Sequence, residues 1–204
     1  MTEVSITTQQ EVARELHKNG LIKFGEFTLK SGIISPFYID LRQVQSFPDT
    51  LRVVTKAYGE LLQNVDESVF LAGVPEAGTP LATAVGYEYG RRLLQPRKVV
   101  KDHGTKSSVE GAFEQGDRVV LLDDLITKGD SKLEAIDQVT KAGLTLDRFI
   151  VLVDREQGGM DTIREAGHTI EAAMTMTSIL GILLSEGELS TEQHDSMINF
   201  IRNN

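Results

Sequence analysis

The chain lacks cysteine altogether. This absence excludes disulfide bridges, thiolate metal sites and cysteine nucleophiles, and it fits a reducing compartment. The first sixteen residues show no basic start followed by an apolar run, so we expect no secretory signal. The most apolar segment, residues 172–184, contains Thr and Ser and is too short to cross a bilayer. We therefore expect a cytoplasmic protein that does not enter a membrane.

Positive charge is also scarce, with 21 Lys and Arg against 30 Asp and Glu and a net charge of -9. A protein that coats nucleic acid needs a basic face for phosphate contacts, so the chain is a poor candidate for this class and we expect no nucleic-acid partner. The 204 residues are enough for one domain that buries its own core without disulfides or metals.

Strand-like apolar runs alternate with amphipathic helical patterns along the chain. This order predicts an α/β fold, with a central, mostly parallel sheet flanked by helices. We expect one domain over residues 1–204, with a core over about 48–175 and a small hood from 1–45 and part of the C-terminal region. Pro48 is placed to begin a helix, and the pairs Ser131/Glu134 and Ser190/Gln193 have the spacing of capping boxes. Residues 100–116 combine glycine and charge with little periodicity, which predicts a mobile functional loop.

The segment VVLLDDLITKGDS, residues 119–131, is the most informative part of the sequence. An apolar strand is predicted to end in two carboxylates, Asp123 and Asp124, before a short loop and a helix that begins at Ser131. A helix N-terminus attracts phosphate, Gly129 permits close approach of the backbone, and the Thr127 hydroxyl can donate to the anion. The carboxylates can accept hydrogen bonds from a ribose diol or interact with a divalent ion.

This local chemistry indicates a sugar-phosphate site, but two other interpretations are open from the segment alone. One is an acidic strand end followed by an ordinary turn, with no ligand. The other is a phosphoacceptor domain of the flavodoxin-like class, in which adjacent Asp residues also occur at strand ends.

The same thirteen residues resemble the phosphoribosyl pyrophosphate signature of the type I phosphoribosyltransferases. Four further segments resemble, in the right order, blocks of orotate phosphoribosyltransferase: FTLKSGIISPFYID (27–40), GVPEAGTPLA (73–82), RKVVKDHGTKSSVEG (97–111) and LVDREQGG (152–159). The resemblance implies the type I phosphoribosyltransferase fold. It also implies transfer of a 5-phosphoribosyl group from phosphoribosyl pyrophosphate (PRPP) to N1 of orotate, giving orotidine 5'-monophosphate and pyrophosphate.

The resemblance also implies which residues bind PRPP. They share a basic character or a place in the signature, and are Lys30, Arg97, Lys98, Lys101, His103, Asp123, Asp124, Leu125, Ile126, Thr127, Lys128, Gly129, Asp130 and Ser131. Lys101, His103 and the two Asp residues are the implied catalytic groups, with Lys101 stabilising the transition state. The family's loop closes over the neighbouring subunit's site, which implies a homodimer. A merely solvated charged loop is the competing interpretation of this basic run.

For orotate, the resemblance implies Arg155 as the partner of the carboxylate, with Thr127, Phe37 and Tyr38 beside the base. The competing interpretations are an ion pair of Arg155 with Asp154 or Glu156, and a plain core role for the two aromatic residues. Mg²⁺ is implied as a cofactor that neutralises the donor pyrophosphate, held mainly by substrate oxygens and water without direct protein ligands.

Two positions depart from the family pattern. The loop 73–80 carries Glu76 and no Lys, which leaves more of the pyrophosphate charge to Lys30 and the basic loop. Asp130 brings an acid into the phosphate loop, and we expect it to point outward. A phosphoribosyltransferase for another base, and a regulator of the same fold that binds nucleic acid, are the alternative functions; Arg155 argues against the first and the net charge against the second.

Overall fold

The computed structural model describes residues 3–28, 32–98 and 108–203. Its helices are α1 (Ile6–Lys18), the 3-10 helix η1 (Leu41–Ser46), α2 (Pro48–Leu61), α3 (Gly78–Glu88), α4 (Asp130–Lys141), α5 (Gly159–Glu165), α6 (Met176–Ser185) and α7 (Thr191–Asn203). Its strands are β1 (Ile22–Thr28), β2 (Ile34–Ile39), β3 (Phe70–Gly73), β4 (Leu93–Pro96), β5 (Val109–Glu110), β6 (Arg118–Ile126), β7 (Thr145–Asp154) and β8 (Ile170–Thr175). Part of the loop predicted at 100–116, namely 100–107, lies outside the described residues.

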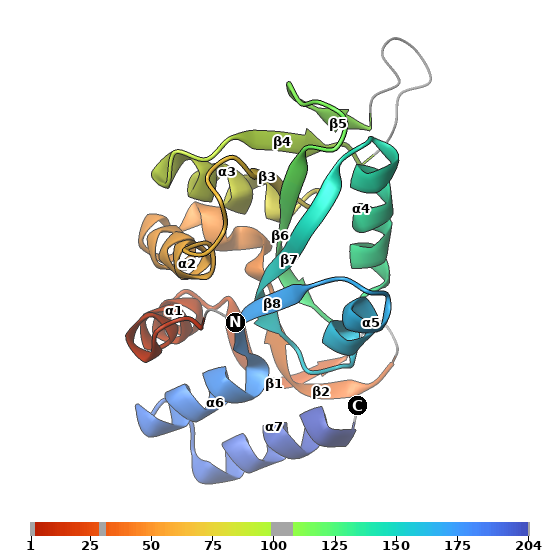
Figure 1. Cartoon of the computed structure of the whole chain (residues 1–204). Coiled ribbons are helices and arrows are strands. Elements are labelled where there is room, and N and C mark those ends of the chain that lie inside the picture. Colours follow the sequence, from red (N-terminus) through yellow and green to blue (C-terminus); the bar gives the residue numbers. More distant parts are fainter. Residues whose placement is uncertain (1–2, 29–31, 99–107, 204) are drawn as a thin grey trace.

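A central sheet organises the described part of the chain. Its strand order is β5-β4-β3-β6-β7-β8, with parallel pairing throughout except for the antiparallel edge strand β5. Helices α4 and α5 cover one face, and α1, α2 and α3 cover the other (Figure 1). This arrangement confirms the predicted α/β class.

The central strand β6 is buried on both faces, as expected of a parallel strand between helical layers. Val120 and Leu122 pack into the apolar cluster shared with α2 and α3, whereas Val119 and Leu121 pack into the cluster shared with α4 and α5. Alternation along one strand therefore joins two cores, and it holds the end of β6 rigidly between them.

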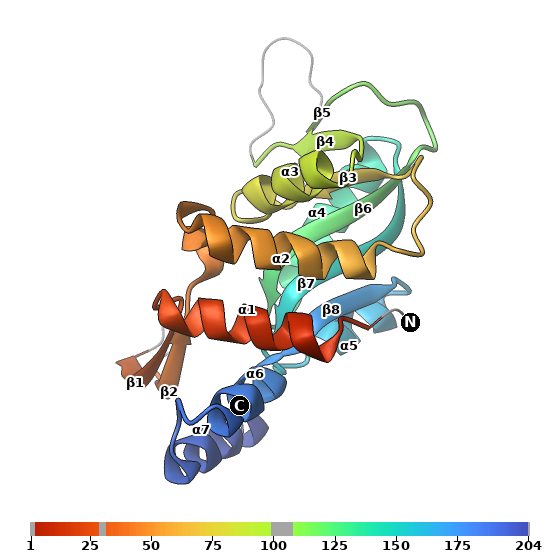
Figure 2. The ribbon, with the colours of Figure 1, turned by 90° about the vertical axis from the view of Figure 1, so that its left-hand side faces the viewer.

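A second, smaller layer is built from the antiparallel hairpin β1–β2 and helix α7. The ring of Phe37 in β2 meets the ring of Phe200 in α7 edge-on, with 5.9 Å between centroids. Helix α1 lies beside α2 instead (Figure 2), where the Glu60 carboxylate accepts hydrogen bonds from the Ser5 N–H at 2.6 Å and the Thr8 hydroxyl at 2.5 Å. The hairpin is thus packed against the C-terminal helix, whereas α1 is hydrogen-bonded to α2.

Of the three helix starts predicted at Pro48, Ser131 and Ser190, two are confirmed and one is wrong. Pro48 is the first residue of α2, and Ser190 and Gln193 exchange the two hydrogen bonds of a capping box, so both predictions are confirmed. The capping box predicted at Ser131 is wrong. Helix α4 starts earlier, at Asp130, because Gly129 precedes it with φ 97°, and no side chain caps it.

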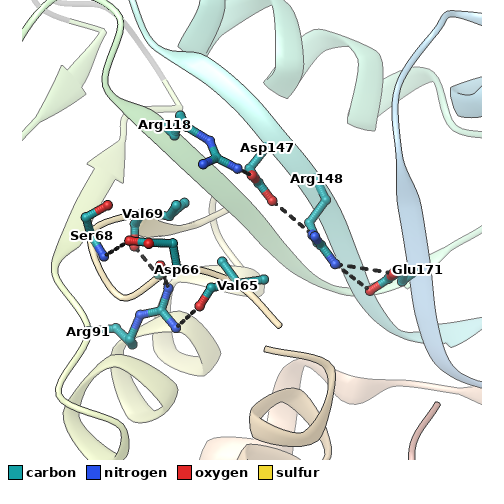
Figure 3. A network of polar contacts seen from close by, with 9 residues as sticks. All are labelled: Val65, Asp66, Ser68, Val69, Arg91, Arg118, Asp147, Arg148 and Glu171. Atoms are coloured by element: carbon teal, nitrogen blue, oxygen red, sulfur yellow. Dashed lines mark hydrogen bonds and ion pairs between the residues drawn. The ribbon is translucent and has the colours of Figure 1, made fainter. Parts of the chain in front are cut away.

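Charged residues near the amino ends of three neighbouring strands form a network (Figure 3). Arg118 of β6 pairs with Asp147 of β7, whose carboxylate also accepts a hydrogen bond from Arg148 Nε at 2.9 Å. Arg148 Nη1 in turn lies 3.4 Å from Oε1 of Glu171 in β8. Ligands of parallel sheets bind at the opposite, carboxyl ends, so this network ties the strands together away from the candidate site.

No helix in the described ranges is long and apolar enough to cross a bilayer.

Candidate active site

The acidic pair lies inside β6, where the sequence predicted it just after the strand. β6 continues to Ile126 because it pairs in parallel with β7 along its length, with Asp123 opposite Val151. Both acids are nearly buried, Asp123 at 4% and Asp124 at 9% exposure. Asp123 Oδ2 lies 2.5 Å from Lys132 Nζ and its Oδ1 accepts a hydrogen bond from the Asp124 N–H. Asp124 Oδ1 accepts from the Leu125 N–H at 2.7 Å.

Burial and, after it, the negative charge of Asp123 raise the pKa of the Asp124 carboxyl from its ordinary value of 3.8 to about 7. The Leu125 N–H and the Lys132 ammonium oppose this shift. Asp124 is therefore poised to change its charge close to neutral pH, which is the behaviour expected of a group in a ligand site.

The predicted phosphate loop follows β6 and lies against the start of α5. The Gly159 N–H donates to the Thr127 carbonyl at 2.8 Å, and a side chain at Gly159 would collide with that carbonyl. Gly129 is buried, whereas Lys128, Asp130 and Ser131 are exposed. Two of the residues predicted to bind PRPP differ in their exposure. Leu125 is half-buried, whereas the Ile126 side chain is fully buried in the core, where it cannot contact a ligand.

A second glycine brings the loop 73–80 against β6. A Cβ at Gly78 would collide with the Leu122 carbonyl, and the Val74 N–H donates to that same carbonyl at 2.9 Å. The start of α3 therefore packs directly onto the backbone that precedes Asp123. The peptide bond between Pro75 and Glu76 in this loop is cis.

Arg155 lies where the turn after β7 meets the hairpin β1–β2. Its guanidinium carbon is 5.9 Å from the centre of the Phe37 ring, and its Nε is buried without a hydrogen-bond partner. Burial lowers the pKa of Arg155, and Tyr38 opposes that shift. Phe37 is fully buried and Tyr38 points outward onto the ring of Phe27, so the two predicted aromatic residues lie on opposite faces of β2.

The turn that carries Arg155 leaves its guanidinium free of its neighbours in the sequence. Glu156 adopts a left-handed φ of 58°, and its carboxylate accepts a hydrogen bond from the Thr177 N–H at 2.6 Å. The Asp154 carboxylate accepts from the Glu156 N–H at 2.8 Å. Among the described residues, neither acid forms an ion pair with Arg155, so the competing surface-pair interpretation does not hold there.

The basic residues at the end of β4 pair with acids. Arg97 pairs with Glu110 of β5, and Lys98 Nζ lies 3.4 Å from the Glu76 carboxylate. Together with the loop 75–80 these side chains line an open groove of about 790 Å³. Glu76 thus engages a cation that the resemblance assigns to pyrophosphate. Lys30, Lys101 and His103 lie outside the described residues, so the structure says nothing of them.

Sequence reasoning missed two residues of this site. Lys132 reaches Asp123 from α4, and the Tyr58 hydroxyl of α2 donates to the Asp123 carbonyl at 2.6 Å. The signal for Lys132 was present, because together with the buried residues Ala135, Ile136 and Val139 it forms the helical pattern i, i+3, i+4, i+7. A lysine on the buried face of a helix needs a buried partner, and the adjacent acids are the obvious candidates.

No protein-family model matches the chain. The chain is 38% identical to orotate phosphoribosyltransferase of Pyrobaculum islandicum over 89% of this chain and 93% of that one. It is 37% identical to uridine 5'-monophosphate synthase of Bos taurus over 89% of this chain. The chain spans only 37–39% of the length of that synthase and two other long relatives.

Solved structures give the same answer. The crystal structure of orotate phosphoribosyltransferase from Aeropyrum pernix superposes with a TM-score of 0.74 at 30% identity, over 88% of this chain and 99% of that one. That of Mycobacterium tuberculosis, in complex with PRPP, gives a TM-score of 0.70 at 25% identity, over 84% and 98%. The chain belongs to the orotate phosphoribosyltransferase family, and this finding confirms the family and the fold that the sequence predicted.

Proposed function

We propose that this chain transfers the 5-phosphoribosyl group of PRPP to N1 of orotate, giving orotidine 5'-monophosphate and pyrophosphate. The proposal rests on one observation: strand β6, which contains Asp123 and Asp124, is hydrogen-bonded directly to the turn that contains Arg155. The Arg155 N–H donates to the Ile126 carbonyl at 3.1 Å, two residues beyond Asp124. A donor site on β6 and a base site on Arg155 therefore lie next to each other, as a transfer between them requires.

Each part of the site has a task in this reaction. The backbone N–H groups at the start of α4 receive the 5'-phosphate, and the acidic pair accepts hydrogen bonds from the ribose hydroxyls. Arg155 meets the orotate carboxylate; its guanidinium is partly desolvated and has no acid partner among the described residues. N1 of orotate then attacks C1 of the ribose and releases its proton to water, while the bond to pyrophosphate breaks with its electron pair leaving on oxygen.

The leaving pyrophosphate needs positive charge. Arg97 and Lys98 stand at the mouth of the groove, and Lys30, Lys101 and His103 complete the basic set by resemblance. We expect pyrophosphate to replace Glu110 and Glu76 as the partner of the first two, because those ion pairs are partly or largely exposed and therefore weak. Lys101 is the group we assign to transition-state stabilisation.

Mg²⁺ fits this site as an ion held by PRPP oxygens and water. In the described ranges no three His, Asp or Glu side chains gather into a group that could hold a metal. The acidic pair suits an indirect role, because both carboxylates already accept hydrogen bonds and Lys132 occupies one oxygen of Asp123. When bound, Mg²⁺ neutralises part of the pyrophosphate charge.

We further propose a homodimer in the cytoplasm, with Lys101 acting in the neighbouring subunit's site. Supporting this, Tyr87 of α3 is 89% exposed beside an open groove of about 570 Å³ between α2 and α3, a surface suited to a second copy. Subunits carrying Lys101→Ala and Arg155→Met, assayed at an orotate concentration low enough that each alone turns over little substrate, should regain about a quarter of the wild-type activity when dissociated and reassembled together. No recovery would contradict sharing of the site.

An absorbance assay tests the proposed function. Protein is mixed with orotate, PRPP and Mg²⁺, and the loss of the ultraviolet absorbance of orotate is followed. We expect a loss that needs all three reactants and disappears in Lys101→Ala. Turnover of uracil or a purine base in place of orotate would show that the fold is right and the assigned base is wrong. Tight PRPP binding without turnover of any base would favour the regulator.

A further inference from the structure

Lys132 is a buried lysine beside the acidic pair. It is the third residue of α4, 7% exposed, and its Nζ lies 2.5 Å from Asp123 Oδ2. Removing an ammonium and a carboxylate from water is costly, and such a pair persists only where the two charges compensate each other at close range. The helix therefore places a fixed positive charge directly behind the candidate donor site.

The ion pair makes the two acids unequal. Both Asp123 oxygens are used within the protein, one by Lys132 and the other by the Asp124 N–H, while the Tyr58 hydroxyl holds the Asp123 carbonyl. Asp124 has no cation within ion-pair distance among the described residues, and its Oδ1 accepts a single backbone N–H, that of Leu125. Asp123 is thus held in place, and Asp124 keeps capacity to accept further hydrogen bonds.

We propose that Lys132 is a positioning residue of the PRPP site, which fixes Asp123 through the ion pair and leaves Asp124 as the carboxylate that receives the ribose hydroxyls. This inference rests on the proposed function and refines it, because the resemblance assigns the two acids the same role. It also adds Lys132, which the signature does not include, to the residues on which PRPP binding depends.

The charge of Lys132 has a second effect on the same site. The described groups that act on Asp124 are Asp123 and Lys132 across β6 and α4, Tyr58 from α2, and Arg42 from η1. The pKa of Tyr58 lies well above 10.0 because it is buried, and the pKa of Arg42 is raised by its pair with Asp40, so both keep their charge state near neutrality. Loss of Lys132 therefore raises the pKa of Asp124 above about 7.

The sign of the pH effect follows from this. A protonated Asp124 loses acceptor capacity for a ribose hydroxyl. At pH 7.5 the Asp124 carboxyl is protonated to a greater extent in a variant without the Lys132 charge than in the wild type. At pH 9 this difference is smaller, because a higher pH favours the ionised carboxylate in both proteins. A defect that comes from the missing charge must therefore shrink as the pH rises, and a defect that comes from general loss of structure must not.

Titration calorimetry with PRPP and Mg²⁺ tests the proposal. Lys132→Met removes charge and hydrogen bond, Lys132→Gln keeps a neutral donor, and Lys132→Arg keeps the charge. Lys141→Met is the matched control, because Lys141 lies on the same helix in an exposed pair with Asp137. Thermal unfolding identifies variants that do not fold. If the Met variant does not fold, the Gln variant tests the proposal in its place.

We expect the Met and Gln variants to bind PRPP about tenfold more weakly than wild type at pH 7.5, and less than about threefold more weakly at pH 9, since each pKa unit is worth up to tenfold. The Arg variant should stay within about threefold at both pH values, and Lys141→Met should match the wild type. A Met or Gln variant that binds like the wild type, or whose defect is equal at both pH values, overturns the inference alone. Wild-type protein that fails to bind PRPP overturns the proposed function and this inference with it.

Discussion

The guanidinium carbon of Arg155 lies 5.9 Å from the centre of the Phe37 ring, so Arg155 and Phe37 bring the turn after β7 close to the hairpin β1–β2. Phe37 itself packs against Phe200 of α7. The C-terminal helix therefore sets the position of the hairpin, and the hairpin lines one side of the space in front of Arg155. A half-buried guanidinium whose Nε has no hydrogen-bond partner, facing an aromatic ring, is suited to a planar anion.

Replacement of Arg155 by Met should raise the KM for orotate about 10- to 100-fold, because charge-assisted hydrogen bonds are worth about 1.5–3 kcal/mol. Protein stability should stay unchanged or rise, since the variant removes a partly desolvated charge whose pKa burial already lowers. Steady-state kinetics and thermal unfolding measure both effects. Arg164→Met is the control, because Arg164 forms an exposed pair with Asp161 on the neighbouring helix; an equal KM in both variants would refute the assigned role.

Replacement of Asp124 by Asn should stabilise the protein and weaken PRPP binding. The folded-state pKa of about 7 lies above the ordinary 3.8, so the contribution of Asp124 to stability falls as pH rises between these values. The variant should therefore gain roughly 1–3 kcal/mol over wild type at pH 8 and little at pH 4. Urea unfolding at the two pH values measures the difference, and an equal difference at both would contradict the raised pKa.

Glycine 159 should tolerate no side chain. Gly159→Ala places a Cβ against the Thr127 carbonyl and should cost about 2 kcal/mol while also weakening PRPP binding, because the phosphate loop is displaced. The matched control is Gly181→Ala in α6, where a Cβ meets nothing within 4 Å and helix propensity should add up to about 1 kcal/mol. Equal stability of the two variants in denaturant unfolding would contradict this account of the loop.

Asp130 is exposed at the first position of α4, and we expect its carboxylate to point away from the phosphate. Asp130→Gly should leave PRPP affinity unchanged or slightly higher. It should also cost about 1 kcal/mol of stability, because glycine is a poor helix former and the acid favours the helix N-terminus. Calorimetry and thermal unfolding separate the two effects. A large loss of affinity would assign the side chain a direct role in binding.

Much of the fold could be predicted from the sequence because apolar runs and helix starts are local signals. The strand over 119–122 and the helix that Pro48 begins both follow from their own residues. The end of β6 could not be predicted, since its last residues are held by pairing with β7, which lies over twenty positions further on. The start of α4 was predicted one residue too late, at Ser131. The helix begins at Asp130, because Gly129, in a left-handed conformation, occupies the N-cap position.

The candidate site divides in the same way. The acidic pair, the loop after it and Arg155 are contiguous motifs, and the structure brings them together through the Ile126 and Thr127 carbonyls. Lys132 and Tyr58 are not part of any motif, and their role comes from packing of α4 and α2 against β6. Their contribution depends on tertiary contacts, which residue type and spacing only partly encode.

The most direct test of the account is the stoichiometry of the products. Orotate and PRPP are incubated with the protein and Mg²⁺, and orotidine 5'-monophosphate and pyrophosphate are quantified by chromatography. The account predicts one molecule of each per orotate consumed, with uracil giving no more product than the Arg155→Met variant gives with orotate. Pyrophosphate released without the nucleotide, or uracil consumed as readily as orotate, would contradict it.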